Sequence, residues 1–168
     1  MAYTITADLQ GILSIVQSFD ATSLPGATGA GAKWTHSGFN QALSLPTSTI
    51  PATKAYVASK ALSGGTASID LTSLTDQSQS AADFTGLKVQ AILAVNPSTN
   101  ANAITITEGA SSGHSISASS SSWKVVLQPG AWFLFYGADA GQDVGASDKT
   151  WDLSGTGSQA LNIAIIAG

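Results

Sequence analysis

Short runs of apolar and β-branched residues, each closed by a turn sequence, recur along this 168-residue chain. Residues 103–107 read Ala-Ile-Thr-Ile-Thr, so that Ile104 and Ile106 share one face of a strand. Similar runs occupy residues 54–62, 66–71, 87–95, 123–127, 131–136 and 161–166. About eight to ten short strands without long helical periodicity predict an all-β fold, an antiparallel β-sandwich of jelly-roll type.

The predicted core consists of apolar side chains within these runs. The run 87–95 is apolar apart from Lys88 and Gln90, which is typical of a central strand buried on most of both faces. The expected core residues are Val89, Ile92, Leu93, Ile104, Ile106, Leu127, Leu134, Ile163 and Ile165.

The chain before residue 54 is richer in Gly and Pro and divides into two regions. In the first 20 residues, the spacing of Ile5, Leu9 and Ile12 also fits a helix, but the Thr, Ile and Val content favours strands. We therefore expect an N-terminal extended arm or strands at residues 1–22, a Gly/Pro-rich connecting region at 23–53 and the β-sandwich core at 54–168.

The composition excludes several classes of function. Charged residues make up only 10% of the chain, the net charge is −4 and there is no Arg, which argues against direct nucleic-acid binding. The absence of Cys excludes disulfides and thiolate chemistry. No apolar run approaches the roughly 20 residues that span a bilayer, so no membrane association is expected. The N-terminus shows no signal-peptide pattern, and we expect synthesis in the cytoplasm without export.

One segment formally matches a catalytic motif. Residues 109–113 read Gly-Ala-Ser-Ser-Gly, the G-x-S-x-G pattern of a nucleophile elbow, and His114 follows. The elbow requires a helix after the nucleophile, and the Ser-rich residues 115–122 do not form one. We interpret the segment as a loop between strands and expect the protein not to be an enzyme.

An acidic stretch offers candidate carboxylates but no recognised ligand spacing. Asp139, Asp143, Asp148 and Asp152 could indicate a calcium site or glycosidase carboxylates, yet their spacing does not match the D-x-[DN]-x-[DN]-G loop. Asp residues also initiate turns, and we favour this reading. No metal or other cofactor is expected.

Aromatic and apolar residues outside the predicted core are the candidate interface. Residues 131–136 place aromatic side chains on both faces of one strand, so one face enters the core and the other lies under a loop or in an interface. The candidate interface residues are Ile5, Ile12, Ile15, Val16, Trp34, Phe39, Trp132 and Tyr136.

Several segments together resemble a group of small bacteriophage and prophage structural proteins. The similar segments are Gly29-Ala30-Gly31-Ala32-Lys33-Trp34, residues 60–74, Gly86-Leu87-Lys88-Val89-Gln90-Ala91-Ile92, the Pro129-Gly130 turn with the following apolar strand, and the apolar C-terminal residues 163–168. They cover most of the chain. The resemblance implies a virion protein, and we expect a head decoration (cement) protein on the capsid surface.

The expected partners follow from this resemblance. They are further copies of the chain, with a trimer favoured, and the phage major capsid protein, whereas nucleic acid and membranes are not expected. The arm, residues 1–19, would add strands to a neighbouring subunit. A tail or fibre component remains an alternative, and a carbohydrate-binding sandwich module that stacks sugars on Trp34, Trp123 or Trp151 is an alternative from another class.

Overall fold

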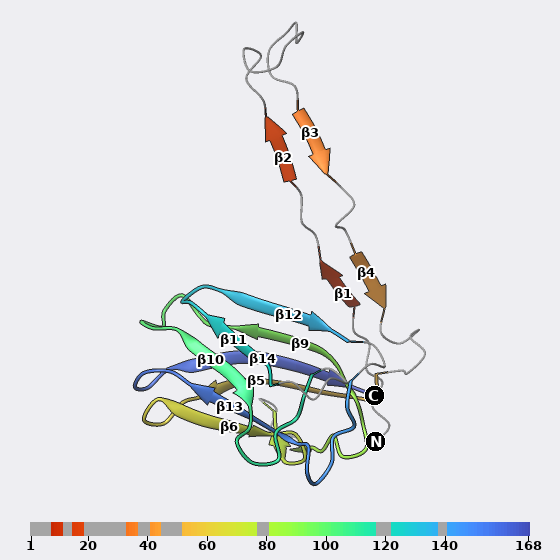
Figure 1. Ribbon diagram of the computed structural model, residues 1–168, viewed down its shortest axis with the longest axis vertical. Coiled ribbons are helices and arrows are strands. Elements are labelled where there is room, and N and C mark those ends of the chain that lie inside the picture. Colours follow the sequence, from red (N-terminus) through yellow and green to blue (C-terminus); the bar gives the residue numbers. More distant parts are fainter. Residues whose placement is uncertain are drawn as a thin grey trace, which may run out of the picture. The chain divides into compact units, whose positions relative to one another are not determined.

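Every regular element among the described residues is a β-strand (Figure 1). The computed structural model describes residues 8–11, 15–18, 33–36, 41–44, 52–76, 81–116, 122–137 and 141–168, and for the four segments before residue 52 it describes the backbone alone. These residues include no helix long and apolar enough to cross a membrane. The strands are β1 (Asp8–Gly11), β2 (Ile15–Ser18), β3 (Lys33–His36), β4 (Gln41–Ser44), β5 (Lys54–Ala61), β6 (Thr66–Asp70), β7 (Leu74–Thr75), β8 (Ala81–Ala82), β9 (Val89–Val95), β10 (Ile104–Glu108), β11 (Lys124–Leu127), β12 (Trp132–Tyr136), β13 (Thr150–Ser154) and β14 (Ala160–Ala167).

Eight of these strands form two four-stranded antiparallel sheets. The strand order is β12-β9-β14-β5 in one sheet and β11-β10-β13-β6 in the other. Strands β7 and β8 form a separate short pair. The all-β, antiparallel prediction is therefore confirmed for the described residues.

The core lies between the inward faces of the two sheets. In β14 every second side chain is buried, namely Leu161, Ile163, Ile165 and Ala167. Strand β13 contributes Trp151 and Leu153 from the other sheet to the same cluster. Complete burial of one such side chain stabilises the fold by roughly 1.5–3 kcal/mol, so this alternation fixes which face of each strand points inward.

Seven of the nine predicted core residues are buried, but two lie on the other side of their sheet. Leu93 is 40% exposed and Leu134, its cross-strand partner, is only half-buried. The pleat explains this difference, because Ile92 and Ala94 point into the core and Leu93 between them must point out. Five of the seven residues of β9 are buried, as expected of a central strand, but the placement of Leu93 in the core was wrong.

The hairpin between β5 and β6 turns at Gly64 and Gly65, a Gly-Gly pair of the kind that favours two-residue hairpin turns. Both residues have positive φ, 59° and 86°, which is the combination that a two-residue type I′ turn requires. Ser63 and Thr66 close the turn with two backbone hydrogen bonds, of 2.9 and 3.1 Å.

Strand β13 was missed in the sequence. It occupies Thr150–Ser154 in the middle of its sheet, between β10 and β6. The predicted acidic loop includes Asp152, which points away from the core while Trp151 and Leu153 are buried. The alternation of polar and apolar residues was the available signal.

Residues Thr6–Leu45 form a separate structural unit, distinct from the unit that contains the two sheets. Within it, β1 pairs with β4 and β2 pairs with β3, both antiparallel. Leu9 lies opposite Leu43, and Val16 lies opposite Thr35. The region predicted as an arm thus supplies β1 and β2, and the region predicted as a connector supplies the strands with which they pair.

Candidate interaction surface

The outward face of the sheet β12-β9-β14-β5 carries almost only apolar side chains. The pairing register arranges twelve outward positions in three cross-strand rows. The rows are Trp132–Val95–Asn162–Ser59, Leu134–Leu93–Ala164–Val57 and Tyr136–Ala91–Ile166–Ala55. We call these twelve residues the apolar face; it contains no charged residue, and its polar groups are those of Asn162 and Ser59, the Tyr136 hydroxyl and the Trp132 indole N–H.

The outward face of the other sheet has the opposite character. Its cross-strand rows are Val126–Thr105–Ser154–Thr66 and Lys124–Thr107–Asp152–Ser68, which we call the polar face. Hydroxyl and charged side chains are what a solvated face of an antiparallel sheet normally carries. One sheet of this protein is therefore adapted to water, and the other is not.

Exposure of large apolar side chains is concentrated on the apolar face. Among the described residues, the exposed large hydrophobic side chains are Trp132 at 65%, Val57 at 50%, Val126 at 49% and Leu93 at 40%. Three of these four belong to the apolar face. Single exposed apolar residues are common in proteins, but a contiguous exposed patch usually marks an interaction site.

A hollow lies in the apolar face between β5, β9 and β14. Its volume is about 280 Å³, and it is lined by residues 57–58 of β5, 93 and 95 of β9 and 162–164 of β14. The small side chain of Ala164 stands between the larger Leu93 and Val57 in one row, which accounts for the depression. The face therefore combines a protruding Trp132 with a hollow two strands away.

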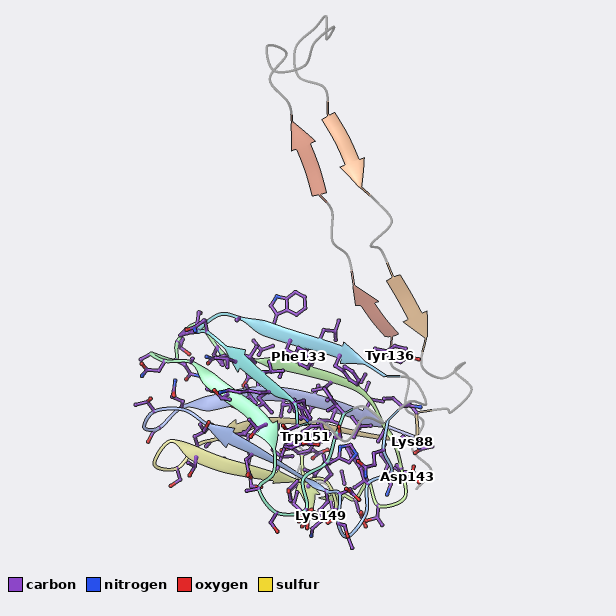
Figure 2. All side chains as sticks on the ribbon, in the orientation of Figure 1. Lys88, Phe133, Tyr136, Asp143, Lys149 and Trp151 are labelled. Carbon is purple, nitrogen blue, oxygen red and sulfur yellow. The ribbon has the colours of Figure 1, made fainter. Side chains whose placement is uncertain are left out.

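Ion pairs of the sheet unit lie away from the apolar face. Lys88 pairs with Asp143 at 2.8 Å, and Lys149 pairs with Asp70 at 3.1 Å. In Figure 2 the labelled Lys149 lies on the opposite side of the sandwich from β12, whereas Lys88 and Asp143 lie at the end of the sandwich to which β12 runs. Partly exposed ion pairs of this kind contribute little to stability. Their main consequence is that the charges of these four residues lie outside the apolar face.

The predicted interface residues fall into two groups. Trp132 and Tyr136 lie on the apolar face. Strand β2 contains Ile15 and Val16, and β3 contains Trp34, but the structure describes only the backbone of these strands. The remaining three, Ile5, Ile12 and Phe39, lie outside the described residues.

Sequence reasoning missed the remaining members of the apolar face, above all Val57 and Leu93. The signal for both was present, because residues 55 and 57 are apolar on the second side of β5 and the run 87–95 is apolar on both sides. A buried face and an interface give the same apolar pattern, so the sequence alone does not separate them.

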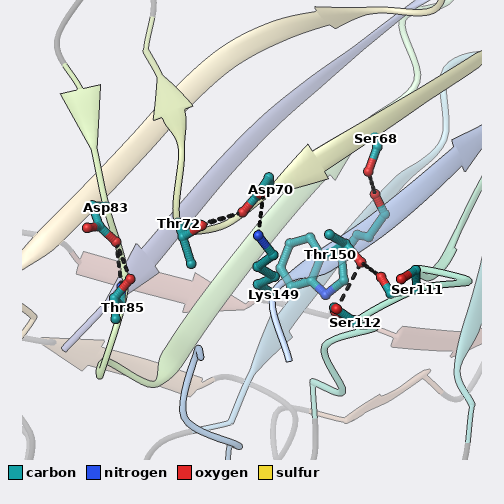
Figure 3. A network of polar contacts seen from close by, with 10 residues as sticks. Ser68, Asp70, Thr72, Asp83, Thr85, Ser111, Ser112, Lys149 and Thr150 are labelled. Atoms are coloured by element: carbon teal, nitrogen blue, oxygen red, sulfur yellow. Dashed lines mark hydrogen bonds and ion pairs between the residues drawn. The ribbon is translucent and has the colours of Figure 1, made fainter. Parts of the chain in front are cut away.

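The G-x-S-x-G segment forms a loop that is bound to β13. Ser111 is exposed, Ser112 has a positive φ of 54°, and the carbonyl oxygens of both accept hydrogen bonds from the Thr150 hydroxyl, at 2.5 and 3.0 Å. Figure 3 shows these contacts beside Lys149 and Asp70. Burial raises the pKa of Asp70, but hydrogen bonds from Thr72 and Lys149 outweigh it and hold that pKa below its ordinary value.

His114 is a buried residue at the end of this loop. Its Nε2 lies 3.1 Å from the Gln142 carbonyl oxygen, and its Nδ1 has no hydrogen-bond partner among the described residues. Its own carbonyl oxygen accepts hydrogen bonds from the indole N–H groups of Trp123, at 3.1 Å, and Trp151, at 3.0 Å. Burial lowers the pKa of the imidazole, opposed only in part by the Gln142 carbonyl and by the charges of Asp148 and Glu108.

These contacts bear on two alternatives raised by the sequence. Trp151 is fully buried and stacks edge-on against Trp123, with ring centroids 5.7 Å apart, so Trp151 offers no platform for a sugar. The acidic residues have separate local partners: Asp143 pairs with Lys88, and Asp152 accepts a hydrogen bond from the Ala110 amide at 2.8 Å. Asp139 lies outside the described residues. In the part of the chain that the structure describes, no three His, Asp or Glu side chains gather as a metal site would require.

Comparison with known protein families, with characterised proteins and with solved structures finds no match to this chain.

Proposed function

We propose that this chain is a bacteriophage virion structural protein, a head decoration (cement) protein that stabilises the capsid through protein–protein contacts. The observation that carries the proposal is the uncharged apolar face, which spans all four strands of its sheet and contrasts with the polar face of the other sheet. A surface without charge loses little hydration energy when another protein covers it. The resemblance of the sequence to small phage structural proteins supports the same conclusion.

We further infer that the two sheets form a jelly-roll sandwich. Four successive strand pairs, β5/β6, β9/β10, β11/β12 and β13/β14, each place one member in each sheet. The partners also follow the same order in both sheets, β5-β14-β9-β12 against β6-β13-β10-β11. This arrangement supports a rolled antiparallel ribbon of eight strands, an architecture that occurs in viral capsid domains and in lectins.

The partners that we propose are further copies of the chain and the major capsid protein, on the surface of the virion. The β1–β4 ladder and the β2–β3 ladder support an N-terminal β arm that is separate from the sandwich. An arm of this kind would contact a neighbouring subunit through strands or through residues such as Ile15 and Val16. Nucleic acid, membranes, cofactors and catalysis have no part in the proposal.

The two alternatives make different use of the same surface. A tail or fibre protein would also assemble through an apolar face. A carbohydrate-binding module would place a sugar on the exposed Trp132, but such sites also need convergent hydrogen-bonding groups, and beside the Trp132 indole the apolar face offers only Asn162, Ser59 and the Tyr136 hydroxyl. We therefore favour assembly over sugar binding.

A particle experiment tests the proposal. Heads and tails of the phage that encodes the chain are separated on a density gradient and analysed by mass spectrometry, and we expect the chain in the heads. Heads stripped of the protein should rebind the wild-type chain, should not rebind Val57→Lys, and should rebind the matched control Val126→Lys, because these two valines have nearly equal exposure on opposite sheets. Recovery with tails alone would favour the tail alternative, and absence from both fractions would refute a virion role.

A further inference from the structure

We propose that the apolar face pairs with the same face of a second copy of this chain, in a two-fold dimer in which Trp132 of each copy enters the hollow of the other. The inference rests on the proposed assembly function, because it names one occupant of the face through which that function would work. It concerns this face alone, so a trimer would use other contacts.

The first argument is that the face is complementary to itself. A two-fold contact places one surface against an identical surface, so it needs a protrusion and a matching depression on the same patch. Trp132, the most exposed large apolar side chain among the described residues, and the hollow of about 280 Å³ meet this requirement. Tryptophan is also the residue type that most often anchors such contacts.

The second argument is the spacing of the strands. Neighbouring strands lie about 4.8 Å apart, and β12 and β14 flank β9 on its two sides. A two-fold axis that runs parallel to β9, midway between the two packed faces, therefore places β12 of one copy over β14 of the other. Trp132 and Asn162 both pair with Val95, so they lie at the same level along the sheet. The axis therefore places Trp132 of one copy over Asn162 of the other, which is part of the lining of the hollow.

The same axis satisfies the distance between packed sheets. Face-to-face sheets lie about 10 Å apart, and an indole ring that stands out from one sheet reaches across most of that gap. Leu93 and Val95 on β9 would each meet their own counterpart in the second copy. Leu93, the more exposed of the two, is thus suited to a measurement of this self-contact.

The third argument is charge. The chain has a net charge of −4, so two copies repel each other least when they meet through a surface that carries no charge. The apolar face is such a place, since all twelve of its residues are uncharged. A strongly charged partner would find nothing on this face to complement its own charge.

The size of the face sets the expected strength. A stable interface uses about 20–30 residues from each partner, and the apolar face supplies twelve. The dimer should therefore be weak in solution, with dissociation constants on the order of micromolar or above. On a particle, many such contacts act together and avidity strengthens them.

Complementation between two variants tests the contact in the full-length chain. Trp132→Glu and Asn162→Lys should each weaken self-association at least about tenfold in sedimentation equilibrium. An equal mixture of the two should recover it in part, because the mixed dimer pairs the new Glu with the new Lys and keeps one native Trp132–Asn162 contact. Val126→Lys is the control and should associate like the wild type. Far-UV circular dichroism of each variant verifies that it is folded.

A crosslinking experiment measures the same contact without disrupting it. The natural chain has no Cys, so Leu93→Cys carries a single thiol, and a short bis-maleimide that spans the roughly 10 Å between packed sheets should link two copies into a dimer. Val126→Cys, on the polar face, should crosslink much more slowly.

The outcomes separate this inference from the proposed function. The dimer would be overturned if the wild-type chain stays monomeric up to millimolar concentration, or if the variants leave association unchanged. In either case another occupant, such as residues 6–45, a capsid protein or a glycan, would have to cover the face. If the chain is found in heads but does not dimerise, only the dimer is wrong. If it dimerises as described but is absent from the particles, only the virion role is wrong.

Discussion

His114 shows how one residue joins a loop to the core. Its carbonyl oxygen receives the indole N–H groups of Trp123 and Trp151, and its ring packs edge-on against Trp151, with centroids 5.9 Å apart. A polar atom in the core needs a partner, and a single carbonyl here serves two tryptophans. The burial of His114 is therefore explained by its contacts with the two tryptophans, without any role for the serine loop beside it.

The buried imidazole should make stability depend on pH. Its pKa is lowered from 6.5 in the folded state because burial disfavours the charged ring, so the unfolded chain binds a proton that the folded chain does not. The free energy of unfolding should therefore be constant above pH about 7 and fall as pH decreases below about 6.5, by up to about 1.4 kcal/mol per pH unit. Urea unfolding between pH 7.5 and about 5 measures this, and the limit on the slope comes from one proton.

Two variants show whether His114 is responsible for that slope. His114→Gln keeps an N–H group for the Gln142 carbonyl but does not titrate, so its stability should change little over the same range. His36→Gln removes the other histidine and should retain the wild-type slope. A slope that persists in His114→Gln would assign the effect to another group.

At the scale of a strand or turn, Gly65 is constrained both by its backbone conformation and by its surroundings. Its φ is 86°, and a Cβ added there would lie 2.8 Å from the carbonyl oxygen of Gly155, which is backbone and has little freedom to move. Gly64 also has a positive φ, but a Cβ at that position meets nothing within 4 Å. A side chain at Gly64 would therefore meet only backbone strain, whereas a side chain at Gly65 would meet both backbone strain and steric overlap.

Substitution at these two positions should have unequal effects. Gly65→Ala should lower the free energy of unfolding by more than about 2 kcal/mol, because it combines an unfavourable φ with a clash. Gly64→Asn should cost less than about 1 kcal/mol, because Asn tolerates this φ and the space is open. Chemical denaturation at constant pH measures both. Equal losses would mean that the Gly155 contact is unimportant.

Local patterns predicted individual strands well and their environments less well. The alternation of residues 103–107 correctly predicted that Ile104 and Ile106 are buried in β10. The same rule, applied to residues 150–154, would have found β13, but Asp152 suggested a turn. Leu93 was wrongly placed in the core because the alternation of a strand shows only which residues share a face. It does not show whether that face is covered by the other sheet.

At the scale of the whole molecule, the two outward faces show what the sequence does not reveal. Which strands neighbour each other depends on contacts far apart in the chain, and only the order β12-β9-β14-β5 brings residues 57, 93, 132 and 164 onto one surface. Trp132 and Tyr136 could be proposed from one aromatic strand. The other residues of the apolar face could not be proposed as an interface from the sequence, since their position on one surface depends on that strand order.

The division of the chain into two structural units leads to the last prediction. Deletion of residues 1–45 removes both members of each ladder, β1–β4 and β2–β3, together with Met1–Ile5 of the unit that contains the sheets, and leaves every strand of the two sheets and the core residues between them. We expect the truncated chain to fold, with cooperative unfolding and a strand-rich far-UV circular dichroism spectrum, and to dimerise through the apolar face as strongly as the full chain. It should nevertheless bind stripped heads more weakly, because the proposed arm contact is missing. Unchanged head binding would show that the arm is dispensable, and loss of dimerisation in a folded truncated chain would move the self-association site to residues 1–45.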